Sequence, residues 1–170
     1  TYNFTNHLIA LEDKFAGKKI DLNKSELTLH KIRTSNTIIA NGHIERFISF
    51  RNNDLPGVML ASSFEKYIHR YGVVPEKEPV IFTNNSSSLS LLKKLISLGC
   101  KPKAYVDSRK KDNIETEIKK ILKDKEIPFF SDAEIEGCDG NKKVETITIR
   151  QGKSFDKIKS SMLCVSGGYN

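Results

Sequence analysis

The sequence has 170 residues, of which 38% are hydrophobic and 29% charged, and its formal net charge is +7 at pH 7. This is the composition of a globular domain, and it excludes collagen-like, disordered and disulfide-scaffold proteins. The positive excess is spread over short lysine runs with no interleaved aromatic residues, so we interpret it as solvated surface and expect no nucleic-acid partner.

The first 40 residues have the pattern of strands. Residues 8–12, Leu-Ile-Ala-Leu-Glu, are expected to form one strand, and residues 26–30 alternate polar and apolar side chains, as a half-buried strand does. Residues 17–19 are expected to form a turn between these two segments. Residues 37–40 are apolar and β-branched and end at Asn41-Gly42, which favours a strand buried on both faces of an α/β sheet.

A helix is expected over residues 60–71, between two irregular connections. Its apolar residues recur at helical spacing, and Gly72 stands where a C-terminal glycine cap belongs. The flanking connections cover residues 49–56 and 73–79.

The clearest pattern is an alternation of strands and helices over residues 80–123. Short apolar strands are expected at 80–83 and 104–107, and amphipathic helices at 89–98 and 113–123. The polar residues 84–88 supply N-caps for the first helix, Gly99 stops it, and Glu115 pairs with Lys119 on the second. The order predicts a parallel sheet with right-handed crossovers.

The last part of the sequence returns to the period of strands. Residues 134–136 and 144–149 alternate and are joined by Asp139-Gly140-Asn141, which favours a hairpin. Residues 162–165 form a final buried strand. The chain is therefore predicted to be an α/β protein with a parallel sheet, crossover helices and a β-meander.

Ligands of an open α/β sheet bind beyond the carboxyl ends of the strands, which here points to residues 83–88. A dinucleotide turn normally carries glycines, because a side chain there collides with the pyrophosphate. Residues 83–88 read Thr-Asn-Asn-Ser-Ser-Ser, without a glycine. Two interpretations stay open: the amides and hydroxyls of this turn hold an anion, or the turn only caps the helix.

Three other strand ends carry candidate residues. Asp107 ends the second strand of the alternating region, where an acidic residue would hold a ribose hydroxyl or would simply begin a turn. The glycines of Asn41-Gly42 and Gly167-Gly168 would let backbone approach a ligand closely, or would only permit turns.

Other chemistry is not indicated by the sequence. The four histidines have no metal-ligand spacing, and no Ser-His-Asp arrangement is visible. Three widely spaced cysteines exclude a disulfide framework and favour a reducing, cytoplasmic setting. No apolar run approaches the ~20 residues of a bilayer span, so we expect no membrane contact. Because the chain opens at Thr1 and stops shortly after a glycine pair, we expect it to be a piece of a longer protein.

Several blocks of the sequence resemble one family. The most specific are residues 54–61, Asp-Leu-Pro-Gly-Val-Met-Leu-Ala, and residues 67–73, Tyr-Ile-His-Arg-Tyr-Gly-Val. Further matching blocks lie at residues 5–12, 42–46, 82–85 and 164–169. Together they resemble the alpha subunit of heterotetrameric sarcosine oxidase, which is built like the two-dinucleotide-domain flavoprotein reductases. Two departures from the family pattern are Asn41 in place of Thr and Phe47 in place of Pro.

The resemblance implies a Rossmann-like FAD/NAD(P)-binding fold in two parts. Residues 1–50 would be the β-meander and return strand of a truncated first dinucleotide-binding domain. Residues 51–170 would be a second, inserted domain of the NAD(P)-binding type. The residues expected to contact a dinucleotide are Asn41, Gly42, Thr83, Asn84, Asn85, Asp107, Gly167 and Gly168.

The resemblance also implies a function for the complete complex, the oxidative demethylation of sarcosine to glycine. In such enzymes the alpha subunit carries NAD, shares FMN with the beta subunit and ends in a tetrahydrofolate-binding region, while beta carries FAD. This chain would be a dinucleotide-domain or scaffold part, with the beta and other subunits as partners, and would be inactive alone.

Two alternatives fit the same residues. One is the alpha subunit of a related amine, opine or proline-type dehydrogenase. The other is a degenerate domain that docks subunits without binding a dinucleotide, and the glycine-free turn at residues 83–88 supports it.

Overall fold

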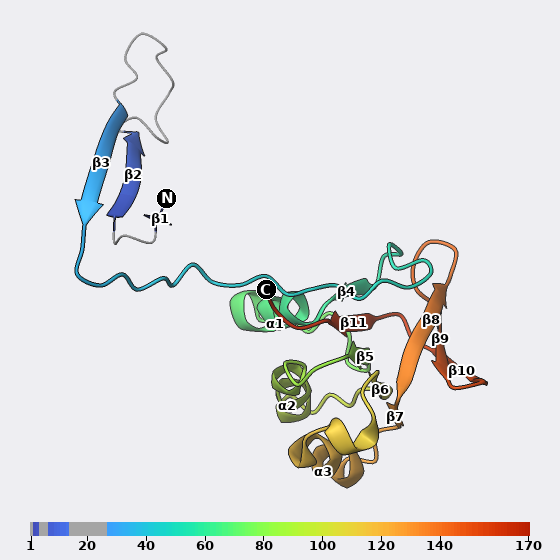
Figure 1. Ribbon diagram of the computed structural model, residues 1–170. Helices are drawn as coiled ribbons and strands as arrows, with labels where there is room; N and C mark the ends of the chain where they lie inside the picture. Colours follow the sequence, from blue (N-terminus) through green and yellow to red (C-terminus); the bar gives the residue numbers. More distant parts are fainter. Residues whose placement is uncertain (1, 4–6, 14–26) are drawn as a thin grey trace. The chain divides into compact units, whose positions relative to one another are not determined.

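The computed structural model describes residues 2–3, 7–13 and 27–170 (Figure 1). Contacts divide the chain into two compact units, Thr1–Gly42 and His43–Asn170. The turn predicted at residues 17–19 lies outside the described residues.

The first unit contains an antiparallel sheet in the order β1-β2-β3. Its strands are β1 (Tyr2–Asn3), β2 (His7–Asp13) and β3 (Leu27–Arg33). The strand predicted at residues 8–12 is confirmed, and so is the one at 26–30 over its described residues, 27–30; β2 and β3 pair along their whole length. The expected half-burial of the latter strand is wrong, because six of the seven residues of β3 are exposed.

The strand predicted at residues 37–40 is wrong. These residues form no strand, and the side chain of Ile38 is 93% exposed. An apolar, β-branched run becomes a strand only where a neighbouring strand completes its backbone hydrogen bonds. No strand among the described residues pairs with this run.

The second unit is built around a five-stranded parallel sheet in the order β4-β11-β5-β6-β7. Its strands are β4 (Val58–Leu60), β5 (Val80–Thr83), β6 (Ala104–Asp107), β7 (Phe129–Ser131) and β11 (Leu163–Ser166). The three central strands, β11, β5 and β6, are buried at every residue, which confirms the prediction of a buried parallel sheet. The three-residue strands β4 and β7 were not predicted.

Three helices cover one face of this sheet (Figure 1). They are α1 (Ala61–Tyr71), α2 (Leu89–Ser97) and α3 (Thr116–Asp124), and a 3-10 turn, η1 (Lys111–Asn113), precedes the last. All three were predicted, and Gly72 ends α1 in the left-handed conformation with φ of 65°. The third helix begins later than residue 113, because η1 takes up the residues before it.

A three-stranded antiparallel sheet covers the other face (Figure 1). Its strands are β8 (Ala133–Asp139), β9 (Thr146–Gln151) and β10 (Ser154–Lys159). The predicted hairpin between β8 and β9 is confirmed, whereas β10 was not predicted because half of its residues are charged and nearly all are exposed.

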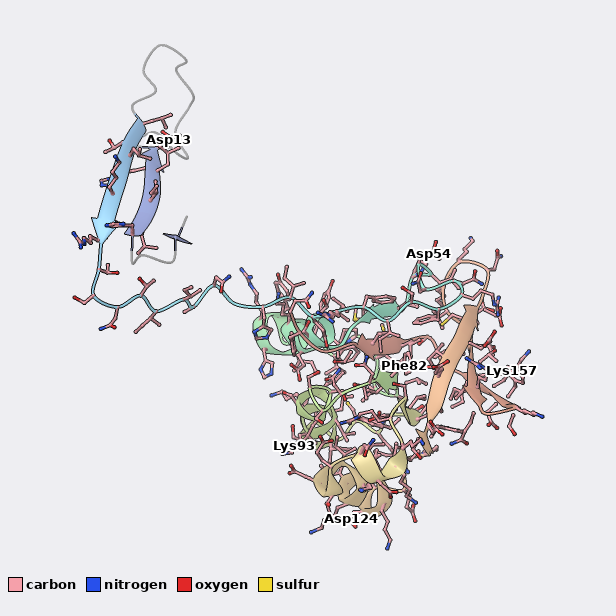
Figure 2. All side chains as sticks on the ribbon, in the orientation of Figure 1. Asp13, Asp54, Phe82, Lys93, Asp124 and Lys157 are labelled. Carbon is pink, nitrogen blue, oxygen red and sulfur yellow. The ribbon has the colours of Figure 1, made fainter. Side chains whose placement is uncertain are left out.

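The parallel sheet therefore lies between two hydrophobic cores. On the helical side, Ile81 of β5 packs in a cluster with buried residues of all three helices. On the other side, Val80 and Phe82 of the same strand pack with buried residues of β8 and β9. Figure 2 shows Phe82 within this unit and Lys93 and Lys157 toward its outside. Alternate side chains of a strand point to opposite faces of the sheet, so β5 contributes side chains to both cores.

Residues 43–50 pack with the second unit. The amide of Arg46 donates to the carbonyl oxygen of Gly168 at 2.7 Å, and its own carbonyl oxygen accepts from the amide of Gly167 at 2.9 Å. By contacts, the chain thus divides after Gly42, whereas the sequence placed the change of domain near residue 50.

Candidate functional site

The turn from β5 to α2 lies at the carboxyl end of the sheet and begins with the buried Thr83. The Thr83 hydroxyl lies 2.9 Å from the carbonyl oxygen of Asn85 and 3.1 Å from that of Ser166, at the end of β11. It also accepts a hydrogen bond from the amide of Asn85 at 3.1 Å. The first side chain of the turn is therefore fully used in holding β5, the turn and β11 together.

Asn85 and Ser87 also link the β5–α2 turn to the end of β11. The side-chain Nδ2 of Asn85 donates to the carbonyl oxygen of Ser166 at 3.0 Å, and its side-chain Oδ1 accepts from the backbone amide of Ser87 at 2.8 Å. The hydroxyls of Ser87 and Ser166 are 2.7 Å apart. Neighbouring Asn84 stays exposed and donates its backbone amide to Ser166 as well.

The predicted N-cap of α2 is wrong in its detail. Ser88 occupies the cap position, but its hydroxyl bonds the Tyr105 hydroxyl at 2.7 Å and makes no cap hydrogen bond. Ser88 already has helical backbone angles, which turn its side chain away from the helix amides. Tyr105 is fully buried, and this burial raises the pKa of its hydroxyl. The Ser88–Tyr105 bond thus satisfies two buried hydroxyls.

Asp107, at the end of β6, is fully buried and bound by Arg109. One carboxylate oxygen accepts from the Arg109 backbone amide at 2.9 Å and from its Nε at 3.1 Å. The other accepts from Nη2 at 2.8 Å. Both oxygens are thus engaged within the chain.

The far side of the Arg109 guanidinium contacts Glu115 and Ser86. Its Nη1 and Nη2 each lie 3.3 Å from a Glu115 oxygen, and Nη1 donates to the Ser86 hydroxyl at 3.1 Å. The hydrogen bond from Ser86, together with Arg109, lowers the pKa of Glu115 to about 2. Hydrogen bonds to Asp107 and Glu115 raise the pKa of Arg109.

Arg109 was not among the predicted site residues, although the Asp-Ser-Arg spacing after β6 was a usable signal. The predicted Glu115–Lys119 ion pair is wrong. Glu115 is the residue before α3, where Arg109 reaches it, and Lys119 instead donates to the carbonyl oxygen of Lys111 at 3.2 Å.

The glycine pair after β11 is required by the protein's own backbone. A Cβ atom on Gly167 would lie 2.7 Å from the carbonyl oxygen of Arg46, closer than real Cβ contacts allow. Gly168 has φ of 83°, and its Cβ would lie 3.5 Å from the side-chain nitrogen of Asn85. Asn41 and Gly42 belong to the first unit. The other six predicted residues belong to the second unit and lie together at one edge of its sheet.

A dinucleotide in the usual pose does not fit the β5–α2 turn. A pyrophosphate there needs glycine backbone and unoccupied amides at the helix N-terminus. Here Thr83, Asn85 and Ser87 fill the turn, and the amide of Ser87 is bound by Asn85. The Asp107 carboxylate, expected at a ribose hydroxyl, is bound by Arg109.

A cavity of about 310 Å³ lies beside the turn, toward the β8–β9 side. Asn84 and Ser108 give it polar groups, and Phe82 and Ile135 give it apolar wall. Among the described residues no group of three His, Cys, Asp or Glu side chains is placed to hold a metal ion. No helix in the described part of the chain is long and apolar enough to cross a membrane.

Sequence comparison gives relatives of one kind. No protein-family model matches the chain. The sarcosine oxidase subunit alpha of Rhizobium meliloti (strain 1021) is 32% identical over 142 residues, which cover 84% of this chain and 14% of that protein. The corresponding subunit of Corynebacterium sp. (strain U-96) is 28% identical, over 82% of this chain and 15% of that protein. The chain thus spans about one seventh of the length of these relatives, and its resemblance to sarcosine oxidase alpha subunits is confirmed.

Solved structures support the fold. The thioredoxin reductase of T. acidophilum superposes with a TM-score of 0.61 at 14% identity, over 89% of this chain and 50% of that one. A FAD-dependent pyridine nucleotide-disulphide oxidoreductase from Desulfovibrio vulgaris gives a TM-score of 0.59 at 13% identity, over 85% and 40%. The predicted Rossmann-like α/β fold of the FAD/NAD(P)-binding type is confirmed.

Proposed function

We propose that this chain, which is homologous to one segment of the sarcosine oxidase alpha subunits, serves as a scaffold segment of such a subunit. The complete complex would be a flavoenzyme that oxidises sarcosine to glycine, with NAD in the alpha subunit, FAD and FMN in the complex and tetrahydrofolate in another region. The beta and remaining subunits would be its partners. Residues 1–50 would belong to a first dinucleotide domain and residues 51–170 to a second one.

One observation carries the scaffold role: the β5–α2 turn is closed by its own side chains. Thr83 and Asn85 tie the turn to Ser166, and Arg109 ties Asp107 to Glu115. A dinucleotide would have to break these bonds and leave buried polar groups unpaired, which costs ~1–3 kcal/mol for each group. The NAD of the complete subunit would therefore be bound outside this turn.

The test is an amide NMR titration of the 170-residue chain with NAD, with FMN and FAD as controls. The proposal expects no saturable shift at Thr83, Asn84, Asn85 or Asp107 with NAD at millimolar concentration. Saturable NAD shifts at these four amides would overturn the scaffold role and support a binding domain instead.

Membership of an amine-oxidising subunit is tested separately, by a chimera. The aligned segment of the Rhizobium meliloti alpha subunit is replaced by this chain, and the chimera is expressed with the other subunits. We expect assembly and sarcosine oxidation, and we expect no turnover by this chain alone. A chimera that assembles but fails to oxidise sarcosine, or turnover by the isolated chain, contradicts the proposal.

A further inference from the structure

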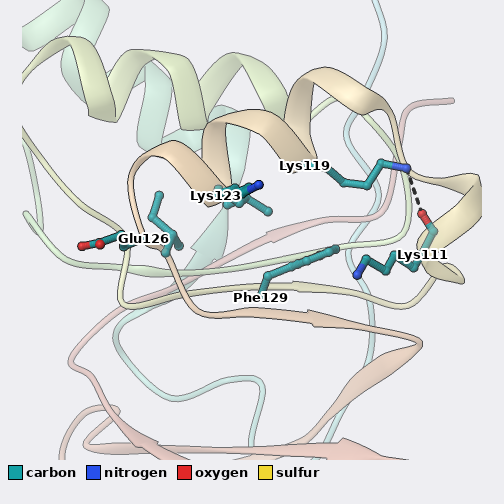
Figure 3. Close-up of a pocket in the computed structure, with 7 residues that line it drawn as sticks. Lys111, Lys119, Lys123, Glu126 and Phe129 are labelled. Carbon is teal, nitrogen blue, oxygen red and sulfur yellow. Dashed lines mark hydrogen bonds between the residues drawn. The ribbon is translucent and has the colours of Figure 1, made fainter.

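A second pocket lies away from the β5–α2 turn, between α3 and β7, and shares no residue with it (Figure 3). Its volume is about 360 Å³, which lies within the range of small-molecule sites. Its floor is apolar. Leu122 and Ile127 are buried there, and the ring of half-buried Phe129 packs against buried Tyr105 with 6.1 Å between ring centroids.

The end of α3 builds this floor. Glu126 takes the left-handed conformation with φ of 51°, and the amide of Ile127 then donates to the carbonyl oxygen of Leu122 at 2.8 Å. This turn brings Ile127 back under the helix, beside Leu122. The floor therefore continues the core on the helical side of the sheet.

The rim of the pocket is basic. Lys111, Lys119 and Lys123 line it together with a single acid, Glu126, so the three lysines exceed the acid by two charges. Lys119 is fixed across the rim by its bond to the carbonyl oxygen of Lys111 at 3.2 Å. The ammonium groups of Lys111 and Lys123 make no ion pair with any described residue.

The charged side chains differ between the two ends of the pocket. Figure 3 shows Lys111 and Lys119 at one end of the pocket, Glu126 at the other, and Phe129 and Lys123 between them. Glu126 and the carbonyl end of α3 disfavour an anion at their end, whereas the two lysines attract one at theirs. An occupant of matching chemistry has an anionic group at the lysine end and a flat apolar body over Phe129.

We propose that this pocket binds a small organic anion with a flat apolar body, such as an aryl carboxylate. The carboxylate would lie between the ammonium groups of Lys111 and Lys119, and the ring would cover Phe129, Leu122 and Ile127. Lysines bind an anion as point charges, so the site selects the charge and the apolar body more than a particular oxyanion geometry.

The test compares two probes that share one ring system, naphthalene-2-carboxylate and the neutral naphthalene-2-carboxamide. Each is titrated into the isotope-labelled 170-residue chain, and the amides of Lys123, Ile127 and Phe129 are followed. We expect saturable shifts with the carboxylate and binding about tenfold weaker with the carboxamide, the loss of one charge-assisted contact.

Variants identify which charge acts. Lys111→Gln should weaken carboxylate binding by about fivefold and leave carboxamide binding unchanged. Lys153→Gln, an exposed lysine of the β9–β10 turn outside the pocket, should change neither. The proposal is overturned if neither probe shifts these amides, if both probes bind equally well, or if Lys153→Gln weakens binding as much as Lys111→Gln.

Discussion

Arg109 is the residue on which most contacts of the candidate site converge. Its side chain is 20% exposed, and the side chain of Asp107 that it binds is fully buried. We predict that Arg109→Met lowers the free energy of unfolding by about 3 kcal/mol, because it leaves a buried carboxylate without its counter-ion. Urea unfolding at pH 7 measures this loss.

The matched control is Arg150→Met. Arg150 binds Glu134 and Glu136, whose side chains are 59% and 47% exposed. Loss of such surface ion pairs should lower the free energy of unfolding by less than about 1 kcal/mol. Equal losses for the two variants would show that Asp107 does not depend on Arg109.

Glu115 gives the second prediction at the scale of single residues. The Ser86 hydroxyl and Arg109 lower its pKa from the ordinary 4.5 to about 2 in the folded protein. A carboxyl whose pKa falls on folding stabilises the protein above its unfolded pKa, and this contribution is lost as the pH drops toward the folded pKa. The wild type should therefore be more stable than Glu115→Gln at pH 6, with the difference shrinking between pH 4.5 and pH 2.

Thermal unfolding of both proteins at pH 6 and pH 3 measures this change. Glu117→Gln is a suitable control, since Glu117 is 55% exposed and forms a surface ion pair with Lys93. A stability difference for Glu115→Gln that stays constant from pH 6 to pH 3 would contradict the assignment.

At the scale of elements, the turn after β11 shows why a glycine can look functional without contacting a ligand. Gly167 was predicted to let backbone approach a dinucleotide, but the backbone that approaches it is that of Arg46. We predict that Gly167→Ala is strongly destabilising in the absence of any cofactor, because the new Cβ would meet a carbonyl oxygen at 2.7 Å.

Gly152→Ala isolates the effect of this contact. Gly152 is left-handed, with φ of 59°, but has open space where its Cβ would stand. Its substitution should lower the free energy of unfolding by only ~1–2 kcal/mol, the penalty of placing alanine in the left-handed conformation. Chemical unfolding of the two variants compares them, and a Gly167→Ala protein as stable as Gly152→Ala would refute the packing argument.

The elements that could be predicted from the sequence are those whose pattern depends on burial. Strands β5, β6 and β11 are buried on both faces, so their apolar runs are unambiguous, and the helices keep one apolar side. The short strands β4 and β7 and the exposed strand β10 have too weak a pattern to be predicted.

The contacts of the candidate site were harder to predict. Asp107 ends β6, Arg109 and Glu115 lie in the connection from β6 to α3, and Ser86 lies in the β5–α2 turn. Only the fold shows that these four residues meet. Likewise, the apolar run at residues 37–40 carries no information about whether a partner strand is present. A sequence pattern indicates whether a segment needs to be buried, but only the folded structure shows which other residues cover it.

At the scale of the whole molecule, the two units differ in how their apolar side chains are covered. In the first, Leu11 and Leu29 face each other across β2 and β3 and are 63% and 57% exposed. In the second, the central strands β5 and β6 are buried at every residue between two cores.

Such a small antiparallel sheet is marginally stable by itself, whereas a covered parallel sheet opens only with global unfolding. We predict that the amides of β2 and β3 exchange with deuterium orders of magnitude faster than those of β5 and β6. Hydrogen exchange of the 170-residue chain at pH 7, followed by mass spectrometry, measures both sets in one sample. Equal protection of the two sets would contradict this prediction and would mean that the apolar side chains of β2 and β3 are covered in solution, by the second unit or by another copy of the chain. Repeating the exchange at lower protein concentration separates these cases, because only association with another copy depends on concentration.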